Sequence, residues 1–159
     1  MTQAASRLDI TEPILLRIGE IAEAEQTEAY VVGGYVRDRL LGRTVKDIDI
    51  VVVGDGIGFA RAVAAALKIA NVVVYEKFGT AMLPMEEGKI EFVAARAEQY
   101  ARDSRKPSVT RASLESDLSR RDFTVNAMAA SLNARGRAEI IDPFEGRRDL
   151  GRHLLDGRL

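Results

Sequence analysis

The sequence predicts an α+β fold in which helices flank a mixed β-sheet. Segments with helical apolar spacing are interleaved with short runs of β-forming residues, which indicates both kinds of element within one domain. Between residues 72 and 93, three such runs follow one another with glycine-containing turns between them. The chain therefore lacks the regular strand–helix–strand alternation that favours a doubly wound parallel sheet.

The first half of the chain predicts a helix, a strand, a helix and a strand. Thr11 suits the cap of the first helix, whose apolar residues recur at helical spacing. Two adjacent glycines end the first strand, and strict alternation followed by an apolar run predicts a central second strand. In order, we expect a helix over residues 11–26, a strand over 29–32, a short helix ending at 42 and a strand over 47–53.

The second half predicts a helix, three strands, a helical region, a last strand and a last helix. The residues between 95 and 110 are polar and aperiodic, which predicts a long loop. Ser113 suits a helix start, and the apolar residues from 118 to 129 extend the helical prediction. In order, we expect a helix over 60–67, strands over 72–75, 81–83 and 90–93, helical residues over 113–129, a strand over 138–141 and a short helix ending at 150.

Composition excludes several classes of site. The 159 residues are 47% hydrophobic and 30% charged, which is ordinary for a globular domain. The absence of cysteine excludes disulfides, a thiol nucleophile and a cysteine zinc site, and the single histidine, His153, excludes a multi-histidine metal site. No segment resembles a signal peptide or approaches the ~20 apolar residues of a membrane span. We therefore expect a cytoplasmic protein with no membrane partner.

The net charge of −1 conceals an asymmetry between the two parts of the chain. Residues 1–100 carry 11 basic and 15 acidic side chains, whereas residues 101–159 carry 12 basic and 9 acidic ones. This is a mild tilt towards an anionic partner in the second part, and an ordinary charged surface explains it equally well.

Asp47 and Asp49 are the strongest local indication of chemistry. Two residues apart on a strand, their side chains leave the same face, while Ile48 and Ile50 point to the other face. Adjacent carboxylates repel each other, and a divalent cation such as Mg²⁺, bound jointly with substrate phosphates, would neutralise them. The alternative is a solvent-facing strand whose polar positions happen to be aspartates.

Gly33 and Gly34 lie between a strand and a helix, one segment before that pair. Glycines at such a turn let backbone N–H groups approach an anion, and Arg37, one turn into the helix, would hold a phosphate oxygen. The alternative is a plain tight turn with a solvated arginine. Residues 54–58 are also glycine-rich, but Phe59 stands where a dinucleotide fingerprint requires its third glycine, so we do not expect a nicotinamide site.

Residues 117–127 form a third cluster, in which adjacent arginines and an amide would supply donors to a triphosphate. A charged helix face is the alternative. Basic residues of the long loop, together with Lys77, would track a polynucleotide backbone, although a solvated loop explains each of them alone. The candidates in that loop are Arg96, Arg102, Arg105 and Lys106.

Several separated motifs in one order resemble the class II CCA-adding tRNA nucleotidyltransferases and bacterial poly(A) polymerases. The resemblance runs from about Tyr30 to Leu150. Its motifs are Val31-Val32-Gly33-Gly34-Tyr35-Val36-Arg37-Asp38, Leu40-Leu41-Gly42, Lys46-Asp47-Ile48-Asp49, Phe78-Gly79-Thr80, Glu91-Phe92-Val93, Arg105-Lys106-Pro107, residues 117–127 and Ile141-Asp142-Pro143-Phe144.

The resemblance implies a head domain with the nucleotidyltransferase fold of the polymerase-beta superfamily, over residues 29–159, on which a helical segment over residues 1–28 packs. It implies that Asp47 and Asp49 hold two Mg²⁺ ions and that Glu91 is a third acidic residue. It also implies a nucleotide site and a region of RNA contact. The nucleotide-binding residues would be Gly33, Gly34, Arg37, Asp38, Arg120, Arg121 and Asn126, and the RNA-binding residues Arg96, Arg105 and Lys106.

The activity implied is magnesium-dependent transfer of a nucleotide from CTP or ATP to the 3′-hydroxyl of an RNA, with CCA addition to tRNA as the leading expectation. Poly(A) addition is one alternative, and a non-catalytic nucleotide- or RNA-binding module with the same fold is the other. The helical neck, body and tail regions of the family do not match these 159 residues. We therefore expect base selection and most tRNA contacts to come from such regions or from a C-terminal partner chain.

Overall fold

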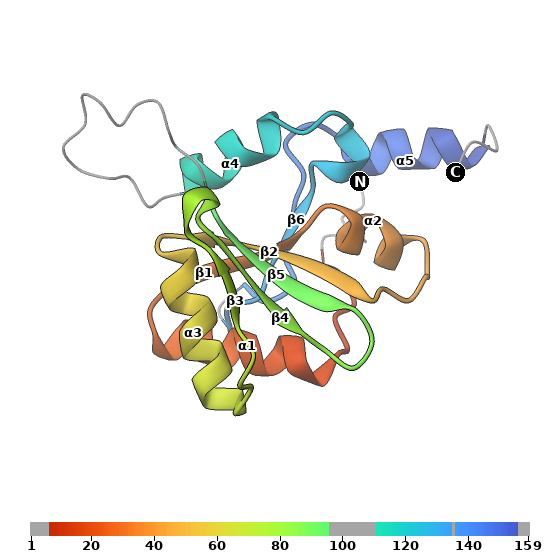
Figure 1. The fold of residues 1–159 in the computed structure, drawn as a ribbon. Helices are drawn as coiled ribbons and strands as arrows, with labels where there is room; N and C mark the ends of the chain where they lie inside the picture. The colour runs from red at the N-terminus through yellow and green to blue at the C-terminus, as the bar shows by residue number, and fades with distance from the viewer. Residues whose placement is uncertain (1–6, 96–110, 135, 156–159) are drawn as a thin grey trace, which may run out of the picture.

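A seven-stranded mixed sheet forms the centre of the computed structural model, which describes residues 7–95, 111–134 and 136–155 (Figure 1). The strand order is β3-β4-β5-β2-β1-β6-β7. Among the described strands, β2 and β5 run parallel and the other neighbouring pairs are antiparallel, which confirms the mixed α+β sheet. The strands are β1 (Glu28–Val32), β2 (Asp47–Val53), β3 (Val73–Tyr75), β4 (Thr80–Pro84), β5 (Lys89–Ala94), β6 (Ala129–Ser131) and β7 (Ile140–Ile141).

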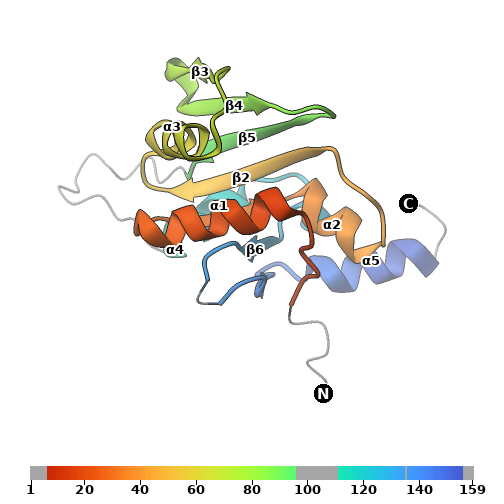
Figure 2. The ribbon, with the colours of Figure 1, turned by 90° about the horizontal axis from the view of Figure 1, so that it is seen from below.

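Helices cover both faces of this sheet. Figure 1 shows α1 and α3 below the sheet and α4 above it, and Figure 2, the view from below, shows α1 and α3 on the same face. The helices are α1 (Pro13–Ala24), α2 (Gly34–Leu40), α3 (Gly56–Leu67), α4 (Arg111–Ser119) and α5 (Gly146–Leu155), with short 3₁₀ helices η1 (Glu76–Phe78) and η3 (Thr124–Asn126).

The alternation of β2 divides the apolar interior into two parts. Ile48, Ile50 and Val52 lie in the larger core cluster, which includes the buried side chains of α1 and α3. Val51 and Val53 lie in a smaller cluster with Leu114 and Leu118 of α4. Because side chains alternate between faces, Asp47 and Asp49 are on the α4 side of the sheet. The sheet thus presents both carboxylates on the face opposite α1 and α3.

The prediction that helical structure continues to residue 129 is wrong. After α4, the chain forms η3 and then β6, which pairs antiparallel with β1 through Val32 and Ala129. Alanine-rich sequence favours a helix locally, but the backbone groups at the edge of β1 are satisfied by a further strand. Tertiary pairing therefore overrides local propensity here.

Smaller differences concern the ends of the helices. The residue that caps α1 is Glu12, which makes no side-chain capping bond, so the expected cap by Thr11 is wrong. The last helix continues past the expected end at residue 150 to Leu155. Nearly all of the expected loop, residues 96–110, lies outside the described residues.

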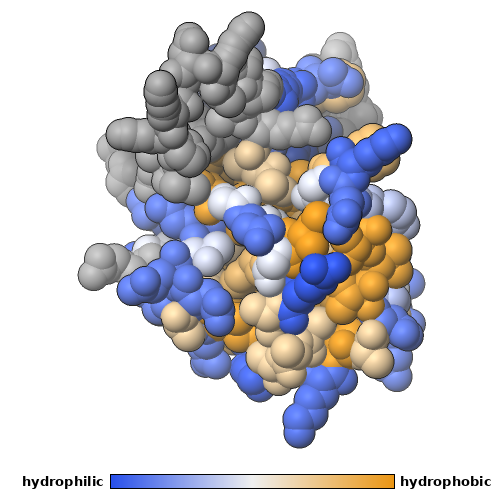
Figure 3. Space-filling view, turned by 60° about the vertical axis from the view of Figure 1, so that its left-hand side comes forward, coloured by the Kyte–Doolittle hydropathy of each residue, from blue (hydrophilic) through white to orange (hydrophobic). Residues whose placement is uncertain are grey.

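Apolar side chains are also present at the surface. Figure 3, which brings the left-hand side of Figure 1 forward, shows apolar side chains in orange between charged ones in blue. Among the described residues, the large hydrophobic side chains Tyr75, Phe78, Phe123 and Phe144 are exposed. Within the described residues, each helix is too short or too polar to cross a membrane.

Candidate active site

The two aspartates of β2 form the acidic side of the site. Asp47 and Asp49 are both exposed, and the parallel pairing of β2 with β5 sets Glu91 opposite Asp49 in the register. The backbone N–H of Lys89 donates a hydrogen bond to Oδ1 of Asp47 at 3.2 Å. Within the described part of the chain, no three His, Cys, Asp or Glu side chains are grouped so that they could hold a metal ion. Glu91 is thus a neighbour of the aspartate pair rather than part of a preformed three-carboxylate centre.

The surroundings of Asp49 favour its neutral form. The pKa of Asp49 is raised above its ordinary value, chiefly because neighbouring protein atoms remove part of the water that would solvate the charged carboxylate. The positive charges of Arg121 and Lys89 oppose this rise, and the negative charge of Asp47 adds to it. A cation bound at the pair would therefore remove an unfavourable interaction.

This donor set fits Mg²⁺. Magnesium is usually held in proteins by one or two carboxylates together with substrate phosphates and water, rather than by a complete cage of side chains. Asp47 and Asp49 supply two hard oxygen donors on one face. The positive charges of Arg121 and Lys89 act on Asp49 and offset part of the negative charge of the two aspartates. The residues present are therefore suited to a magnesium ion shared with a triphosphate.

Gly33 gives the turn its shape and leaves space for an arginine. Its φ of 68° and ψ of −125° are values that residues with a side chain rarely adopt. The backbone N–H of Gly33 donates to the carbonyl of Met128 at 3.1 Å, so this N–H is already engaged. A Cβ on Gly33 would lie 3.0 Å from Nη1 of Arg121. Gly33 therefore contributes room for a guanidinium rather than a donor to an anion.

Arg121 connects the turn to the aspartates. Its guanidinium lies against Gly33 and its charge acts on Asp49. Nη2 of Arg121 pairs with Oδ1 of Asp117 at 3.5 Å. The Nε atom is buried and has no hydrogen-bond partner among the described residues. A buried donor without a partner is costly, and a bound anionic ligand is one way to satisfy it.

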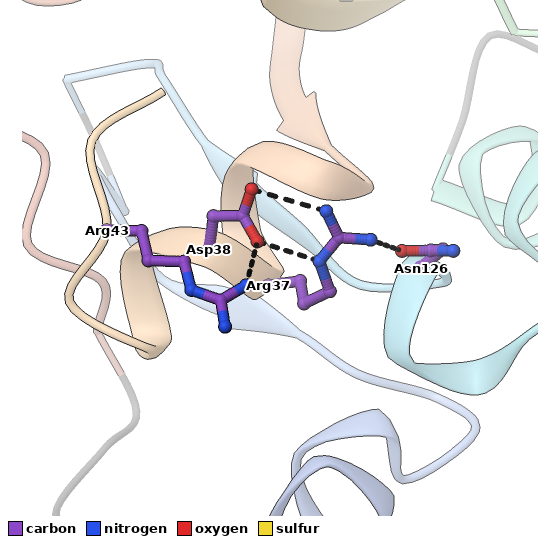
Figure 4. Close-up of polar contacts among 4 residues, drawn as sticks. All are labelled: Arg37, Asp38, Arg43 and Asn126. Carbon is purple, nitrogen blue, oxygen red and sulfur yellow. Dashed lines mark hydrogen bonds and ion pairs between the residues drawn. The ribbon is translucent and has the colours of Figure 1, made fainter. Parts of the chain in front are cut away.

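Arg37 lies against Gly34, the second glycine of the turn. Its Nη2 is 3.4 Å from the position that a Cβ on Gly34 would occupy. Nε and Nη2 donate to the carboxylate of Asp38 at 2.8 and 3.2 Å, and Nη1 donates to Oδ1 of Asn126 at 2.8 Å (Figure 4). The bond to Asp38 is the main reason that the pKa of Arg37 is raised. Each glycine of the Gly33-Gly34 turn thus has an arginine side chain beside it.

Most of the predicted site residues meet in this region, but not all. Asp47, Asp49 and Arg121 are close enough to interact, and the turn connects them to Arg37, Asp38 and Asn126. Arg120 is exposed at the end of α4. The predicted RNA-binding residues Arg96, Arg105 and Lys106 lie outside the described residues.

Sequence reasoning missed three residues that shape the site. Asp117 precedes Arg121 by four positions, the spacing of an ion pair on a helix, and this signal was available in the sequence. Arg43 pairs with Asp38 at 3.7 Å, and Lys89 reaches Asp47 only because β5 lies beside β2. Neither contact has a sequence signal.

The glycine-rich segment after β2 has a structural role. Oδ1 of Asp55 accepts a hydrogen bond from the N–H of Gly58 at 2.9 Å and so caps α3. A Cβ on Gly56 would lie 2.9 Å from the backbone N of Ala94, so this glycine permits close packing of α3 on β5. The segment thus caps α3 and lets it pack closely on β5.

Comparisons with protein families and with known relatives agree on one family for this chain. Residues 29–156 match the Poly A polymerase head domain family. The chain is 49% identical over 122 residues to the A-adding tRNA nucleotidyltransferase of Aquifex aeolicus, a match that covers 77% of this chain and 15% of the relative. It is 43% identical to the CC-adding tRNA nucleotidyltransferase of Deinococcus radiodurans, with 81% of this chain and 34% of the relative covered.

Solved structures of similar proteins have the same fold. The CCA-adding enzyme of Thermotoga maritima in complex with tRNA superposes with a TM-score of 0.75 at 36% identity, covering 89% of this chain and 32% of that one. A tRNA nucleotidyltransferase in complex with a primer tRNA and an incoming ATP analogue superposes with a TM-score of 0.72 at 44% identity, covering 84% of this chain and 36% of that one. The chain therefore spans about a third or less of the lengths of these relatives. With this fold and a family match over most of its length, the chain belongs to the Poly A polymerase head domain family and has its nucleotidyltransferase fold.

Proposed function

We propose that this chain is the catalytic head of an enzyme that adds nucleotides from ATP or CTP to the 3′ end of tRNA. The observation that carries the proposal is the position of Arg121, which lies against Gly33 of the turn while its charge acts on Asp49. Phosphate-binding groups and metal-binding carboxylates are thereby adjacent. The names of the relatives, which are A-adding, CC-adding and CCA-adding tRNA nucleotidyltransferases, support tRNA as the acceptor.

In this proposal, the arginines bind the triphosphate and the aspartates hold magnesium. Arg121, beside Gly33, and Arg37, beside Gly34, neutralise phosphate charge. Magnesium held by Asp47 and Asp49 would supply activation of the RNA 3′-hydroxyl and stabilisation of the leaving group. The 3′-hydroxyl loses its proton to water, its oxygen forms a bond to the α-phosphorus, the bond from that phosphorus to the oxygen that bridges to the β-phosphorus breaks, and pyrophosphate leaves. Correct positioning and neutralised charge suffice, so no protein nucleophile is needed.

The two alternative functions differ from the proposed one in different ways. Poly(A) addition has another acceptor, and a binding module has no chemistry. Poly(A) addition uses the same donor chemistry, and the description of the matching family includes poly(A) polymerase, so it is the second candidate. A purely binding module has no need of two adjacent carboxylates that repel each other. The exposed Asp47 and Asp49 pair therefore favours a catalytic head over a binding module.

We infer that base selection and most of the contacts with tRNA come from polypeptide outside the head. The described residues around the turn are arginines, glycines and carboxylates, which address phosphate and metal rather than a base edge. The relatives that have been solved with tRNA are about three times as long as the part this chain matches. A neck and body on the same polypeptide or on a partner chain would supply the missing contacts.

A chimaera tests the proposed function directly. This chain would replace the matching head of the Thermotoga maritima CCA-adding enzyme, and the product would be incubated with ATP, CTP, Mg²⁺ and tRNA lacking its 3′-terminal nucleotides. Sequencing of the tRNA 3′ ends should show added nucleotides with the parent head and none with Asp49→Asn. A folded chimaera that binds tRNA and MgATP but extends no tRNA would overturn the assignment as a catalytic head. Extension by a long run of adenosines would favour poly(A) addition, whereas a single added adenosine would agree with the A-adding relatives.

A further inference from the structure

The guanidinium of Arg37 is held on two sides in the protein without ligand. Asp38, its neighbour on α2, accepts two hydrogen bonds from it, and Asn126 of η3 accepts a third (Figure 4). Asn126 lies 89 positions further along the chain, so the contact joins two distant segments. The side chain of Arg37 is 28% exposed, which leaves one part of it open to solvent. Its orientation is therefore fixed before any nucleotide arrives.

The remaining donors of this guanidinium suit a phosphate. Arginine has five N–H groups, one on Nε and two on each Nη. Within the described residues, Asp38 takes one from Nε and one from Nη2, and Asn126 takes one from Nη1. One N–H on each Nη then remains, and Nη2 lies 3.4 Å from the position that a Cβ on Gly34 would occupy. Charged N–H donors of this kind suit phosphate oxygens.

Asp38 and Asn126 direct their side-chain oxygens at Arg37. The carboxylate of Asp38 is negatively charged, and its oxygens already accept from Arg37 and lie 3.7 Å from Arg43. The side-chain oxygen of Asn126 is occupied by Arg37. Direct contact would place an anion beside an anion in the first case, whereas in the second only the amide Nδ2 remains as a donor.

We propose that Asp38 and Asn126 are positioning residues, which act on the nucleotide only by holding the Arg37 guanidinium over Gly34. The inference deepens the proposed function and rests on it. Both residues belong to motifs that sequence reasoning assigned to nucleotide contact, and the geometry gives them a different role. A guanidinium that is already oriented loses less conformational freedom when it binds phosphate.

A double-mutant cycle distinguishes positioning from direct contact. A residue that acts only through Arg37 has no effect on affinity once Arg37 is removed, whereas a residue that contacts the nucleotide keeps its effect. The variants are Asn126→Ala, Arg37→Ala and the double variant, and the measurement is the dissociation constant of MgATP by calorimetry. Arg37→Met, which retains the length of the side chain, replaces Arg37→Ala if the latter does not fold.

We expect Asn126→Ala to weaken MgATP binding by about fivefold in the parent, since the guanidinium of Arg37 then loses one of the bonds that orient it. In the Arg37→Ala background the same change should alter affinity by less than about twofold. Affinity for adenosine, which lacks phosphates, should be unchanged throughout.

Asn133→Ala is the matched control for loss of stability. The side chain of Asn133 likewise joins distant segments, because it accepts a hydrogen bond from the N–H of Ala29 and donates one to the carbonyl of Thr27. It lies just beyond the other end of β6. Its loss should lower the melting temperature and leave MgATP affinity unchanged. An equal loss of affinity from Asn126→Ala with and without Arg37 would overturn the inference. Absence of MgATP binding to the parent chain would instead overturn the proposed function, and the inference with it.

Discussion

The guanidinium of Arg121 lies against Gly33, with Nη1 3.0 Å from the position that a Cβ on that glycine would take. The two residues are 88 positions apart in sequence (121 − 33) and meet because η3 and β6 return the chain to the edge of β1. The glycine therefore has two functions at once. It adopts a backbone conformation that side chains disfavour, and it makes room for an arginine whose charge also acts on Asp49.

Gly33→Ala should weaken MgATP binding by at least about tenfold, because the new methyl group displaces Arg121 from the turn. Gly42→Ala is the matched control, since Gly42 also has a positive φ, of 78°, but has nothing within 4 Å of an added Cβ. Both variants should lose about 1 kcal/mol of unfolding free energy from backbone strain. Calorimetry and urea unfolding measure the two effects. Equal MgATP affinity in the two variants would contradict the role given to the Gly33–Arg121 contact.

Arg37→Ala should weaken binding of triphosphates far more than binding of adenosine. A charge-assisted contact contributes roughly 1.5–3 kcal/mol, which corresponds to a loss of about tenfold or more. Arg39→Ala is the control on the same helix, because the guanidinium of Arg39 bonds to the carbonyl of Asp9 instead. Parallel titrations of MgATP and adenosine provide the comparison. Similar losses for both ligands would place Arg37 away from the phosphates.

Tyr35→Phe should lower the unfolding free energy by about 1 kcal/mol at neutral pH, because it removes a buried hydrogen bond. The Tyr35 hydroxyl donates to Oε1 of Glu12 at 2.5 Å and so ties α2 to the start of α1. Tyr75→Phe is the control, since Tyr75 is 45% exposed. Urea unfolding measures both changes.

The buried hydroxyl of Tyr35 should also make the folded protein less stable at high pH. Burial, and after it the hydrogen bond to Glu12, raises the pKa of Tyr35 far above its ordinary value. The stabilisation is complete below the ordinary tyrosine pKa of about 10 and is lost as the pH rises above it, because only the unfolded phenol ionises there. The unfolding free energy of the parent should therefore fall more steeply above pH ~10 than that of Tyr35→Phe. Parallel curves for the two proteins would show that Tyr35 ionises in the folded state.

The chain should bind ATP, CTP, GTP and UTP with magnesium at affinities within about tenfold of one another. Selection of one base requires buried donors and acceptors that match its edge. The described groups around the turn address the triphosphate, which all four nucleotides share. Parallel titrations decide the matter. A preference well beyond tenfold for ATP and CTP would place base reading within the head.

Local signals in the sequence predicted the parts of the site that lie on one element. The alternation in β2 predicted that Asp47 and Asp49 share a face, and the paired glycines predicted the turn before α2. Each of these features depends on residues that are neighbours in sequence, so periodicity and turn chemistry are sufficient to find them.

Contacts between distant segments were outside the reach of such signals. The alanines of β6 favour a helix in the sequence. This segment is a strand because it pairs with the edge of β1. The bond from Arg37 to Asn126 and the approach of Lys89 to Asp47 depend in the same way on how strands are ordered in the sheet. The roles of Asp38 and Asn126 therefore became visible only in the structure.

The central claim is that Asp47 and Asp49 bind a triphosphate through magnesium, and calorimetric titration of ATP with and without Mg²⁺ tests it most directly. The proteins compared are the parent, Asp47→Asn, Asp49→Asn and Asp55→Asn. Asp55→Asn makes the same change of charge at the cap of α3, where asparagine is an equally good capping residue. We expect Mg²⁺ to strengthen ATP binding by about tenfold or more in the parent and in Asp55→Asn, and to have no effect in the other two variants, which should be at least as stable as the parent because a repulsion is removed. Magnesium-dependent binding that survives unchanged in both Asp47→Asn and Asp49→Asn would contradict the account.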